Sequence, residues 1–406
     1  MVRSILAAVL GCALVPTIVQ AQPYNVGDKV VVIRDSPISL PEGKVGDAFI
    51  GQVLQVGALN GKWLWVSSGN PGWLDSASVV PLDRRAIDRL TELIRAEPRS
   101  SARYSGRAGV WAALGELDIA IGDYSESIRL NPQAANYNNR GRAWHAKGEY
   151  DKAIADFNEA LRIDPKYEIA YTNRGNAWQL KREYDKAIAD YNETLRLDPK
   201  DVFAFNNRGC AWKAKGEYDK AIADLNETLR LDPKYFAAYT NRGDVWKEKG
   251  EYNKAIDDYS KAVQLNPKDS LAYFNRGISQ WILRQPGSMD DFQQVLDLEG
   301  WNGVNARYAS IFGTLAARSM NDASRAERFL RDSAGKLKEE WPYPAVRFLR
   351  GELDEAGLLA LADTGDRETE ARCYLGYDHL HHDRKEEALA QFRWIREKGN
   401  STFTEH

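Results

Sequence analysis

Residues 173–199 read NRGNAWQLKREYDKAIADYNETLRLDP, and this stretch decides the fold because the chain repeats it. The copy at residues 207–233 reads NRGCAWKAKGEYDKAIADLNETLRLDP, and the two copies start 34 residues apart. Self-similarity at a fixed period of this size indicates a repeat architecture, in which each unit buries its apolar surface against its neighbours. We therefore expect most of the chain to be a stack of similar small units.

Columns of identical residues run through the copies at the same spacing. The tripeptide Asn-Arg-Gly starts at Asn139, Asn173, Asn207, Asn241 and Asn275. Other columns hold Trp144, Trp178, Trp212 and Trp246, then Ala153, Ala187, Ala221 and Ala255, and then Pro165, Pro199, Pro233 and Pro267. These columns resemble the tetratricopeptide repeat, a helix–turn–helix unit of this period. The resemblance implies a mainly α fold, a solenoid in which helix pairs stack into a right-handed superhelix.

The repeats are expected to cover residues 83–302 in about six units, because shifted copies flank the clear ones. Residues 303–406 are expected to form a degenerate helical region, in which Gly376, Ala388, Phe392 and Ile395 still fit the spacing. The stretch RETEARCYLG, residues 367–376, is similar to the C-terminal part of periplasmic tetratricopeptide repeat adaptor lipoproteins.

Residues 22–82 have β-character. We expect five short strands, at residues 30–33, 49–56, 63–66, 72–74 and 78–80, with a tight turn at Asn60-Gly61. The run Gly72-Trp73-Leu74 followed by Val79-Val80-Pro81-Leu82 resembles bacterial SH3-like domains. The resemblance implies a small β-barrel that recognises peptides or cell-wall material. Two roles stay open for Trp63, Trp65 and Trp73: filling the barrel core, or lining a ligand groove.

The first 21 residues are predicted to be a secretory signal peptide. Arg3 precedes an apolar run from Ile5 to Val19, and Val19-Gln20-Ala21 has the form of a cleavage site. The protein is therefore expected to be periplasmic or secreted. Val9-Leu10-Gly11-Cys12 is a partial lipobox, and we expect membrane attachment only if Cys12 is lipidated. Cys210 and Cys373 remain in the mature chain, either as buried thiols or as one disulfide.

Composition narrows the class of function. The 406 residues carry a formal charge of −3, from 55 Lys and Arg against 58 Asp and Glu, which argues against nucleic-acid binding. No nucleophile-elbow, H-E-x-x-H, phosphate-loop or dinucleotide motif is present, and the charged residues recur with the repeat. We therefore expect no enzyme activity and no cofactor. The cluster of His379, His381 and His382 could hold zinc, but a solvated helix end is the preferred interpretation, with no metal site.

The asparagine column is the best site candidate. It resembles the asparagine ladder of superhelical tetratricopeptide repeats, which hold extended peptides by their backbone on the inner, concave face. An amide offers a donor and an acceptor, as each peptide unit does. Packed helices lie roughly 8–10 Å apart and an extended chain rises about 3.3 Å per residue, so one asparagine could meet about every third peptide unit. The predicted peptide-binding asparagines are Asn139, Asn173, Asn207, Asn241 and Asn275.

The alternative is that these amides satisfy helix carbonyls or face water. Five hydrogen bonds of about 1 kcal/mol each would hold many peptides weakly, so specificity would come from neighbouring side chains. The predicted specificity residues are His145, Gln179, Lys213 and Lys247. The family's carboxylate clamp is disfavoured, because the inner positions that need Lys or Arg hold polar residues or the apolar Ile169, Phe203 and Leu271.

The arginine column is interpreted as structural. Each arginine is expected to pair with an aspartate of the neighbouring helix, with its stem packed on tryptophan. The predicted pairs join Arg140, Arg174, Arg208 and Arg242 to Asp156, Asp190, Asp224 and Asp258.

Two functions follow from these patterns. The first is an exported, non-enzymatic scaffold that binds peptides or partner proteins in its concave groove. The second is a cell-wall tether, in which the SH3-like domain binds peptidoglycan and the repeats recruit an envelope enzyme.

Overall fold

The computed structural model describes residues 24, 26–33, 36–40, 43–49, 52–60, 63–66, 72–75, 78–301, 303–333, 336 and 340–399. The predicted signal peptide and Cys12 lie outside these residues. The chain divides into two compact units, unit 1 (Met1–Glu193) and unit 2 (Thr194–His406), which are described separately. Among the described residues, no helix has the length and apolar character needed to cross a membrane.

Unit 1 begins with an antiparallel sheet. Its strands are β1 (Lys29–Val32), β2 (Ser36–Leu40), β3 (Gly43–Ala48), β4 (Val53–Asn60), β5 (Trp63–Val66), β6 (Gly72–Asp75) and β7 (Val79–Pro81). They follow the order β3-β2-β6-β5-β4-β1-β7. The hairpin at Asn60 is confirmed, since Asn60 pairs with Trp63. The prediction of five strands missed β2 and β3, whose sequences SPISL and GKVGDA lack clear apolar alternation, and it placed β4 too early.

The tryptophans of the sheet lie away from its core. Leu64, Val66 and Leu74 are fully buried in that core. Because side chains alternate along a strand, Trp63 and Trp65 take the opposite face of β5. Trp65 pairs with Trp73 across β5 and β6, and their rings meet edge to face at 5.4 Å. Leucine and valine, rather than tryptophan, therefore fill this core.

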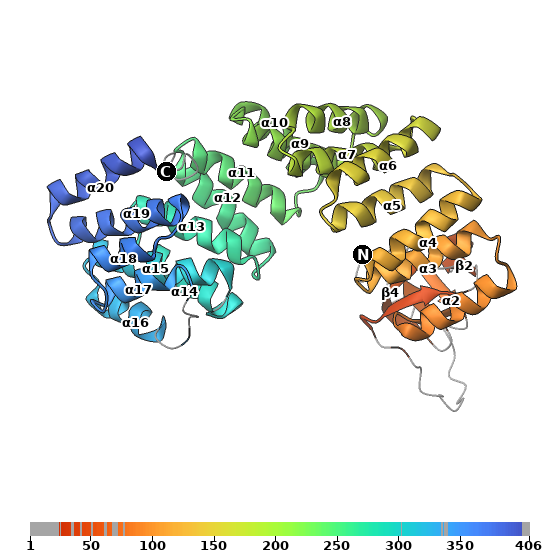
Figure 1. The fold of residues 1–406 in the computed structure, drawn as a ribbon, viewed down its shortest axis with the longest axis horizontal. Helices are drawn as coiled ribbons and strands as arrows, with labels where there is room; N and C mark the ends of the chain where they lie inside the picture. The colour runs from red at the N-terminus through yellow and green to blue at the C-terminus, as the bar shows by residue number, and fades with distance from the viewer. Residues whose placement is uncertain are drawn as a thin grey trace. The chain divides into compact units, whose positions relative to one another are not determined.

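The rest of unit 1 is helical (Figure 1). Helix α2 (Arg84–Ala96) packs Ile87 and Leu90 against Val31 of the sheet. Antiparallel pairs follow: α3 (Ser101–Ala113) with α4 (Leu117–Leu130), and α5 (Ala134–Ala146) with α6 (Tyr150–Ile163). Helices α7 (Glu168–Leu180) and α8 (Tyr184–Leu197) come next, and α8 ends within unit 2.

Unit 2 continues the series of helix pairs. Each of the first pairs is one repeat: α9 (Val202–Ala214) and α10 (Tyr218–Leu231), α11 (Phe236–Glu248) and α12 (Tyr252–Leu265), and α13 (Ser270–Ile282) and α14 (Gly287–Glu299). The later helices are α15 (Val304–Ser319), α16 (Ala323–Ser333), α17 (Tyr343–Leu349), α18 (Glu355–Leu361), α19 (Gly365–His381) and α20 (Lys385–Lys398). A mainly α, solenoid-like fold is thus confirmed.

The glycine of each Asn-Arg-Gly tripeptide lets the two helices of a repeat touch. A Cβ added to Gly175 would lie 2.7 Å from the Tyr191 ring, and one added to Gly243 would lie 2.7 Å from the Tyr259 ring. A Cβ at Gly376 would meet Phe392 at 2.6 Å, so α19 and α20 pack in the same way. No side chain fits at these positions without displacing an aromatic ring.

The predicted arginine–aspartate pairs are confirmed. Arg140 meets Asp156 at 2.7 Å, and the same contact recurs in the following repeats, including Arg276 with Asp291 at 2.6 Å. Each pair joins the two helices of one repeat. The guanidinium lies over a ring three residues earlier, as Arg140 lies over Tyr137. Lysine ammonium groups lie over the tryptophans, as that of Lys152 lies over Trp144.

Candidate functional site

The first helices of successive repeats form a continuous surface in unit 2. Helix α11 contacts α9 on one side and α13 on the other. We call the surface of α9, α11 and α13 the A face. It carries Asn207, Asn241, Asn275, Lys213 and Lys247, five of the predicted site residues.

Asparagine amides join neighbouring first helices. Asn241 Nδ2 donates to Asn206 Oδ1 at 2.8 Å, and Asn206 Nδ2 donates to Asn207 Oδ1 at 3.1 Å. In unit 1, Asn173 Nδ2 donates to Asn138 Oδ1 at 2.9 Å. Asn173 and Asn241 are half-buried, and each keeps its Oδ1 and one N–H without a partner among the described residues. Each of these two amides thus uses one N–H to join successive repeats and leaves its other polar groups open to a ligand.

The last asparagine of the column has a different role. Asn275 is buried, donates to Asp244 Oδ1 at 3.1 Å and accepts from Lys247 Nζ at 3.2 Å. The first, Asn139, is half-buried on α5 in unit 1. The five asparagines therefore have different surroundings in the structure, although each begins the same Asn-Arg-Gly tripeptide.

Asp244 is the acidic group that interacts with the lysines of the A face. It accepts from Lys213 Nζ at 3.1 Å and from the Tyr259 hydroxyl at 2.7 Å. Burial acts to lower the pKa of Lys213, but attraction to Asp244, Cys210 and Glu248, together with the hydrogen bond to Asp244, outweighs it and the pKa is raised. Burial lowers the pKa of Lys247, and repulsion from Lys213 adds to the effect. Lys213 thus pairs directly with the half-buried Asp244 carboxylate, whereas Lys247 donates to Asn275 and is the less compensated of the two lysines.

The sequence prediction did not include Asp244. It occupies the column that holds Asn176 and Cys210 in the preceding repeats. The only signal was the change of residue type within a repeating column, which does not reveal that Lys213 and Asn275 both donate to this carboxylate.

The other specificity candidates lie in unit 1. Gln179 Oε1 accepts from the Tyr191 hydroxyl at 3.1 Å, so the amide is held against the second helix of its own repeat. His145 is half-buried, and its Nε2 is buried with no hydrogen-bond partner among the described residues. Burial lowers the pKa of His145, so the ring is neutral at pH 7.

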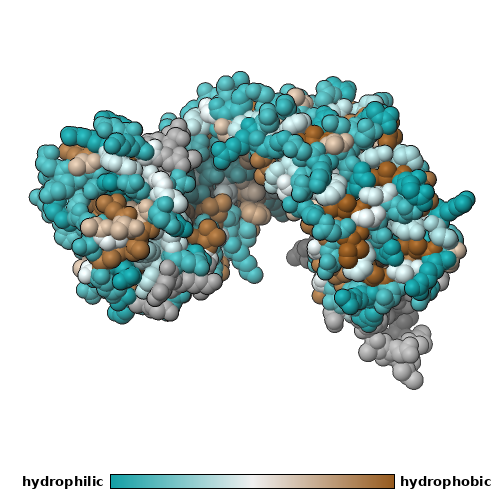
Figure 2. All heavy atoms as spheres, viewed as in Figure 1, coloured by the Kyte–Doolittle hydropathy of each residue, from teal (hydrophilic) through white to brown (hydrophobic). Residues whose placement is uncertain are grey.

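Large apolar side chains are exposed near the start of the first helices. Phe203 on α9 is 61% exposed and Leu271 on α13 is 45% exposed. Apolar patches of this kind interrupt an otherwise hydrophilic surface (Figure 2). Exposed apolar groups beside polar ones are typical of surfaces that bind other proteins.

Cysteine and histidine provide no reactive or metal-binding centre in the described chain. Cys210 and Cys373 are free, which decides between the two alternatives, and burial raises their pKa to about 11 and about 12. His379 is buried against Glu355, whereas His382 contacts Asp378. No group of three possible metal ligands occurs among the described residues.

The comparisons agree with the repeat pattern. The family model described as TPR repeat matches residues 141–181, 211–250 and 243–282, and the model described as Tetratricopeptide repeat matches residues 169–201. The chain therefore contains tetratricopeptide repeats, as the sequence predicted. No curated protein matches the chain.

Solved structures of low sequence identity are similar to parts of the chain. YrrB, described as a TPR protein with an unusual peptide-binding site, is 22% identical, with 45% of this chain and 95% of YrrB covered and a TM-score of 0.38. A tetratricopeptide repeat protein from Parabacteroides merdae is 21% identical over 56% of this chain and 91% of its own, with a TM-score of 0.48. Pseudomonas aeruginosa PilF is 20% identical over 49% and 89%, with a TM-score of 0.44.

Proposed function

We propose that this tetratricopeptide repeat chain is an exported, non-enzymatic scaffold that binds extended segments of partner proteins on the A face of unit 2. Tetratricopeptide repeats generally mediate protein–protein interactions. The proposal that the protein acts in the periplasm or outside the cell depends on the leader-like sequence of residues 1–21.

The orientation of the Asn241 amide is the observation that carries the proposal. Its hydrogen bond to Asn206 fixes the amide plane before any ligand arrives. The remaining acceptor and donor match the N–H and C=O of a peptide unit. Because the amide is already ordered, binding a peptide costs little side-chain entropy.

Side chains on the A face, including those of the flanking helices α9 and α13, indicate which peptides fit. Phe203 and Leu271 offer exposed apolar surface to apolar side chains. Lys247 supplies a positive charge that Asp244 only partly balances. We therefore expect preferred segments to combine apolar residues with an acidic one.

Affinity capture from an envelope extract, followed by titration of the captured segments as synthetic peptides, tests this proposal. Asn241→Ala should weaken peptide binding about threefold to tenfold, as expected for one or two lost hydrogen bonds. Asn253→Ala is the matched control, because Asn253 is exposed on the second helix α12. Equal affinities of the native chain and Asn241→Ala, with circular dichroism unchanged, would rule out the A face as the binding site.

The tryptophans of the sheet favour a second candidate function, the cell-wall tether. Trp63 is 37% exposed, and Trp65 and Trp73 beside it are half-buried outside the core. Aromatic side chains that have an apolar ring surface and one edge exposed to water are common at recognition surfaces. The full chain should co-sediment with purified peptidoglycan sacculi, and Trp73→Ala should reduce the bound fraction. A chain that stays in the supernatant would exclude the tether and leave the scaffold proposal intact.

A further inference from the structure

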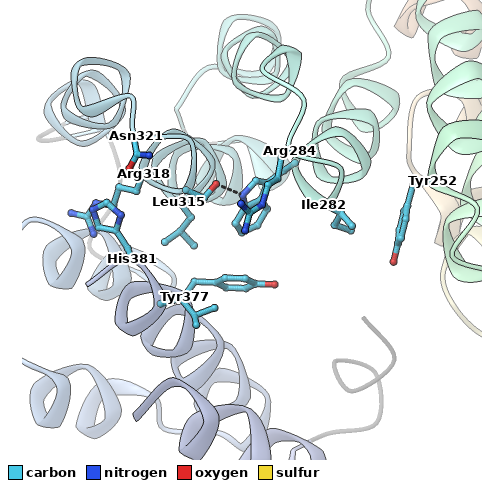
Figure 3. Close-up of a pocket in the computed structure, with 11 residues that line it drawn as sticks. Tyr252, Ile282, Arg284, Leu315, Arg318, Asn321, Tyr377 and His381 are labelled. Atoms are coloured by element: carbon cyan, nitrogen blue, oxygen red, sulfur yellow. Dashed lines mark hydrogen bonds between the residues drawn. The ribbon is translucent and has the colours of Figure 1, made fainter. Parts of the chain in front are cut away.

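A cavity of about 450 Å³ lies among the C-terminal helices of unit 2, beyond the A face asparagines. Trp281 and Ile282 at the end of α13, Leu315 of α15, and Tyr377 and Leu380 of α19 line it (Figure 3). This volume is in the range of pockets that bind small molecules. The walls thus combine these apolar side chains with at least as much polar surface, and Tyr252 of α12 also lines them.

The polar groups of the cavity leave one positive charge unbalanced. No carboxylate of the described residues lines it. Arg318 is already paired with Asp378 at 2.8 Å and with the Leu349 carbonyl at 2.6 Å. The Arg284 side chain, by contrast, is exposed and has no hydrogen bond or ion pair with any described residue. Burial lowers the pKa of His381, so this ring adds no charge at pH 7.

Two phenol groups add hydrogen-bond donors. The hydroxyls of Tyr252 and Tyr377 have no partner among the described residues, and Figure 3 shows the Tyr377 ring across the cavity from Arg284 and Ile282. Burial raises the pKa of Tyr377 to about 12, so its hydroxyl stays protonated and can donate. A guanidinium and hydroxyl donors beside the apolar side chains of Trp281, Leu315 and Leu380 suit an amphiphilic anion.

Arg284 also has an unusual backbone. Its φ of 55° lies in the left-handed region, where an equivalent turn of other repeats has Gly148, Gly216 or Gly250. A residue with a Cβ pays about 1 kcal/mol or more in this conformation. Glycine would therefore serve the turn better, although Asn321 and Asp383 take the same conformation between later helices of unit 2. Arg182, with a φ of 61°, is the matching exception in unit 1.

We propose that this cavity binds a small organic monocarboxylate with an apolar body. Arg284 holds the carboxylate, and Trp281, Leu315 and Leu380 contact the apolar part. A single uncompensated guanidinium matches one negative charge better than the two of a phosphate monoester. This site is separate from the asparagines proposed to bind peptides.

Titration of the full chain with 4-phenylbutyrate and with its neutral counterpart 4-phenylbutan-1-ol, followed by calorimetry and tryptophan fluorescence, tests the proposal. The acid should bind saturably and at least about tenfold more tightly than the alcohol, because only the acid makes charge-assisted hydrogen bonds. Arg284→Gly should weaken binding of the acid by a similar factor without loss of folding, since glycine takes this conformation at positions 148, 216 and 250. Arg182→Gly, the same change at the same repeat position, should leave binding unchanged.

Three results of these titrations would overturn the proposal. They are equal binding of acid and alcohol, no binding of the acid up to about 10 mM, and native affinity in Arg284→Gly. A capped Phe-Glu peptide that binds more tightly than the free acid would also overturn it, in favour of peptide recognition. Asn241→Ala should not change 4-phenylbutyrate binding, so failure of the peptide site and failure of this site can be told apart.

Discussion

Asn241 and Asn206, thirty-five residues apart, are joined by a hydrogen bond of 2.8 Å between the first helices of two successive repeats. The same relationship joins Asn173 and Asn138 in unit 1 at 2.9 Å. One amide therefore serves both the stacking of repeats and the proposed binding of peptides. This double use explains why removing a ligand-facing asparagine should also have a measurable effect on stability.

Asn206→Leu should lower the free energy of unfolding by about 1–3 kcal/mol. The buried Asn206 side chain accepts from Asn241, and its loss leaves a half-buried N–H unsatisfied. Urea unfolding measures the effect, with Asn253→Leu at an exposed position of α12 as control. A loss no greater than that of the control would show that this hydrogen bond adds nothing to repeat stacking.

Gly243→Ala should destabilise unit 2 by about 1–3 kcal/mol, because the new Cβ would lie 2.7 Å from the Tyr259 ring. Gly209→Ala is the matched comparison, since its Cβ would meet the smaller, more adaptable Leu225 at 3.0 Å. We expect a smaller fall in Tm for Gly209→Ala. The opposite order would mean that the helices adjust without cost to the aromatic ring.

Arg242→Ala should cost about 3–5 kcal/mol, because it leaves the buried carboxylate of Asp258 without its partner at 2.6 Å. The double variant Arg242→Leu with Asp258→Asn should recover much of this loss, since no buried charge remains unpaired. Chemical denaturation of the two variants and the native chain provides the comparison. Equal stability of the single and double variants would contradict the ion-pair interpretation.

The free energy of unfolding should depend on pH in part because of the buried carboxyl group of Glu370. This side chain accepts from Trp341 Nε1 at 2.7 Å and from the Tyr374 hydroxyl at 3.3 Å, yet burial raises its pKa. The folded state therefore holds the proton more tightly than the unfolded state, and stability falls as pH rises from the unfolded pKa through the raised folded pKa.

Glu370→Gln removes this titration. The free energy of unfolding of the native chain, relative to that of the variant, should decrease as pH rises from about 4 towards 7. Urea unfolding of both proteins at several pH values measures the difference. A difference that is constant over this range would show that Glu370 has the same pKa in both states.

Much of the candidate site was predictable because it repeats. The Arg174–Asp190 and Arg208–Asp224 pairs have the same sequence separation, so one argument predicts them all. The column of Asn173 and Asn241 could be placed on the first helices for the same reason. Their donation to Asn138 and Asn206 could not, because an amide side chain has several possible partners nearby and only packing selects one.

The sequence by itself determined the helix pairs, the close helix contact at each glycine and the ion pair within each repeat, because these depend on short separations that recur in every copy. Only the tertiary structure decided which asparagines stay open, that Lys213 pairs with Asp244 while Lys247 donates to Asn275, and that Arg284 borders a cavity. These features join residues from different repeats or from the divergent C-terminal helices, where no periodicity links one position to another. Their contacts follow from how the helices pack, which a repeat pattern alone does not contain.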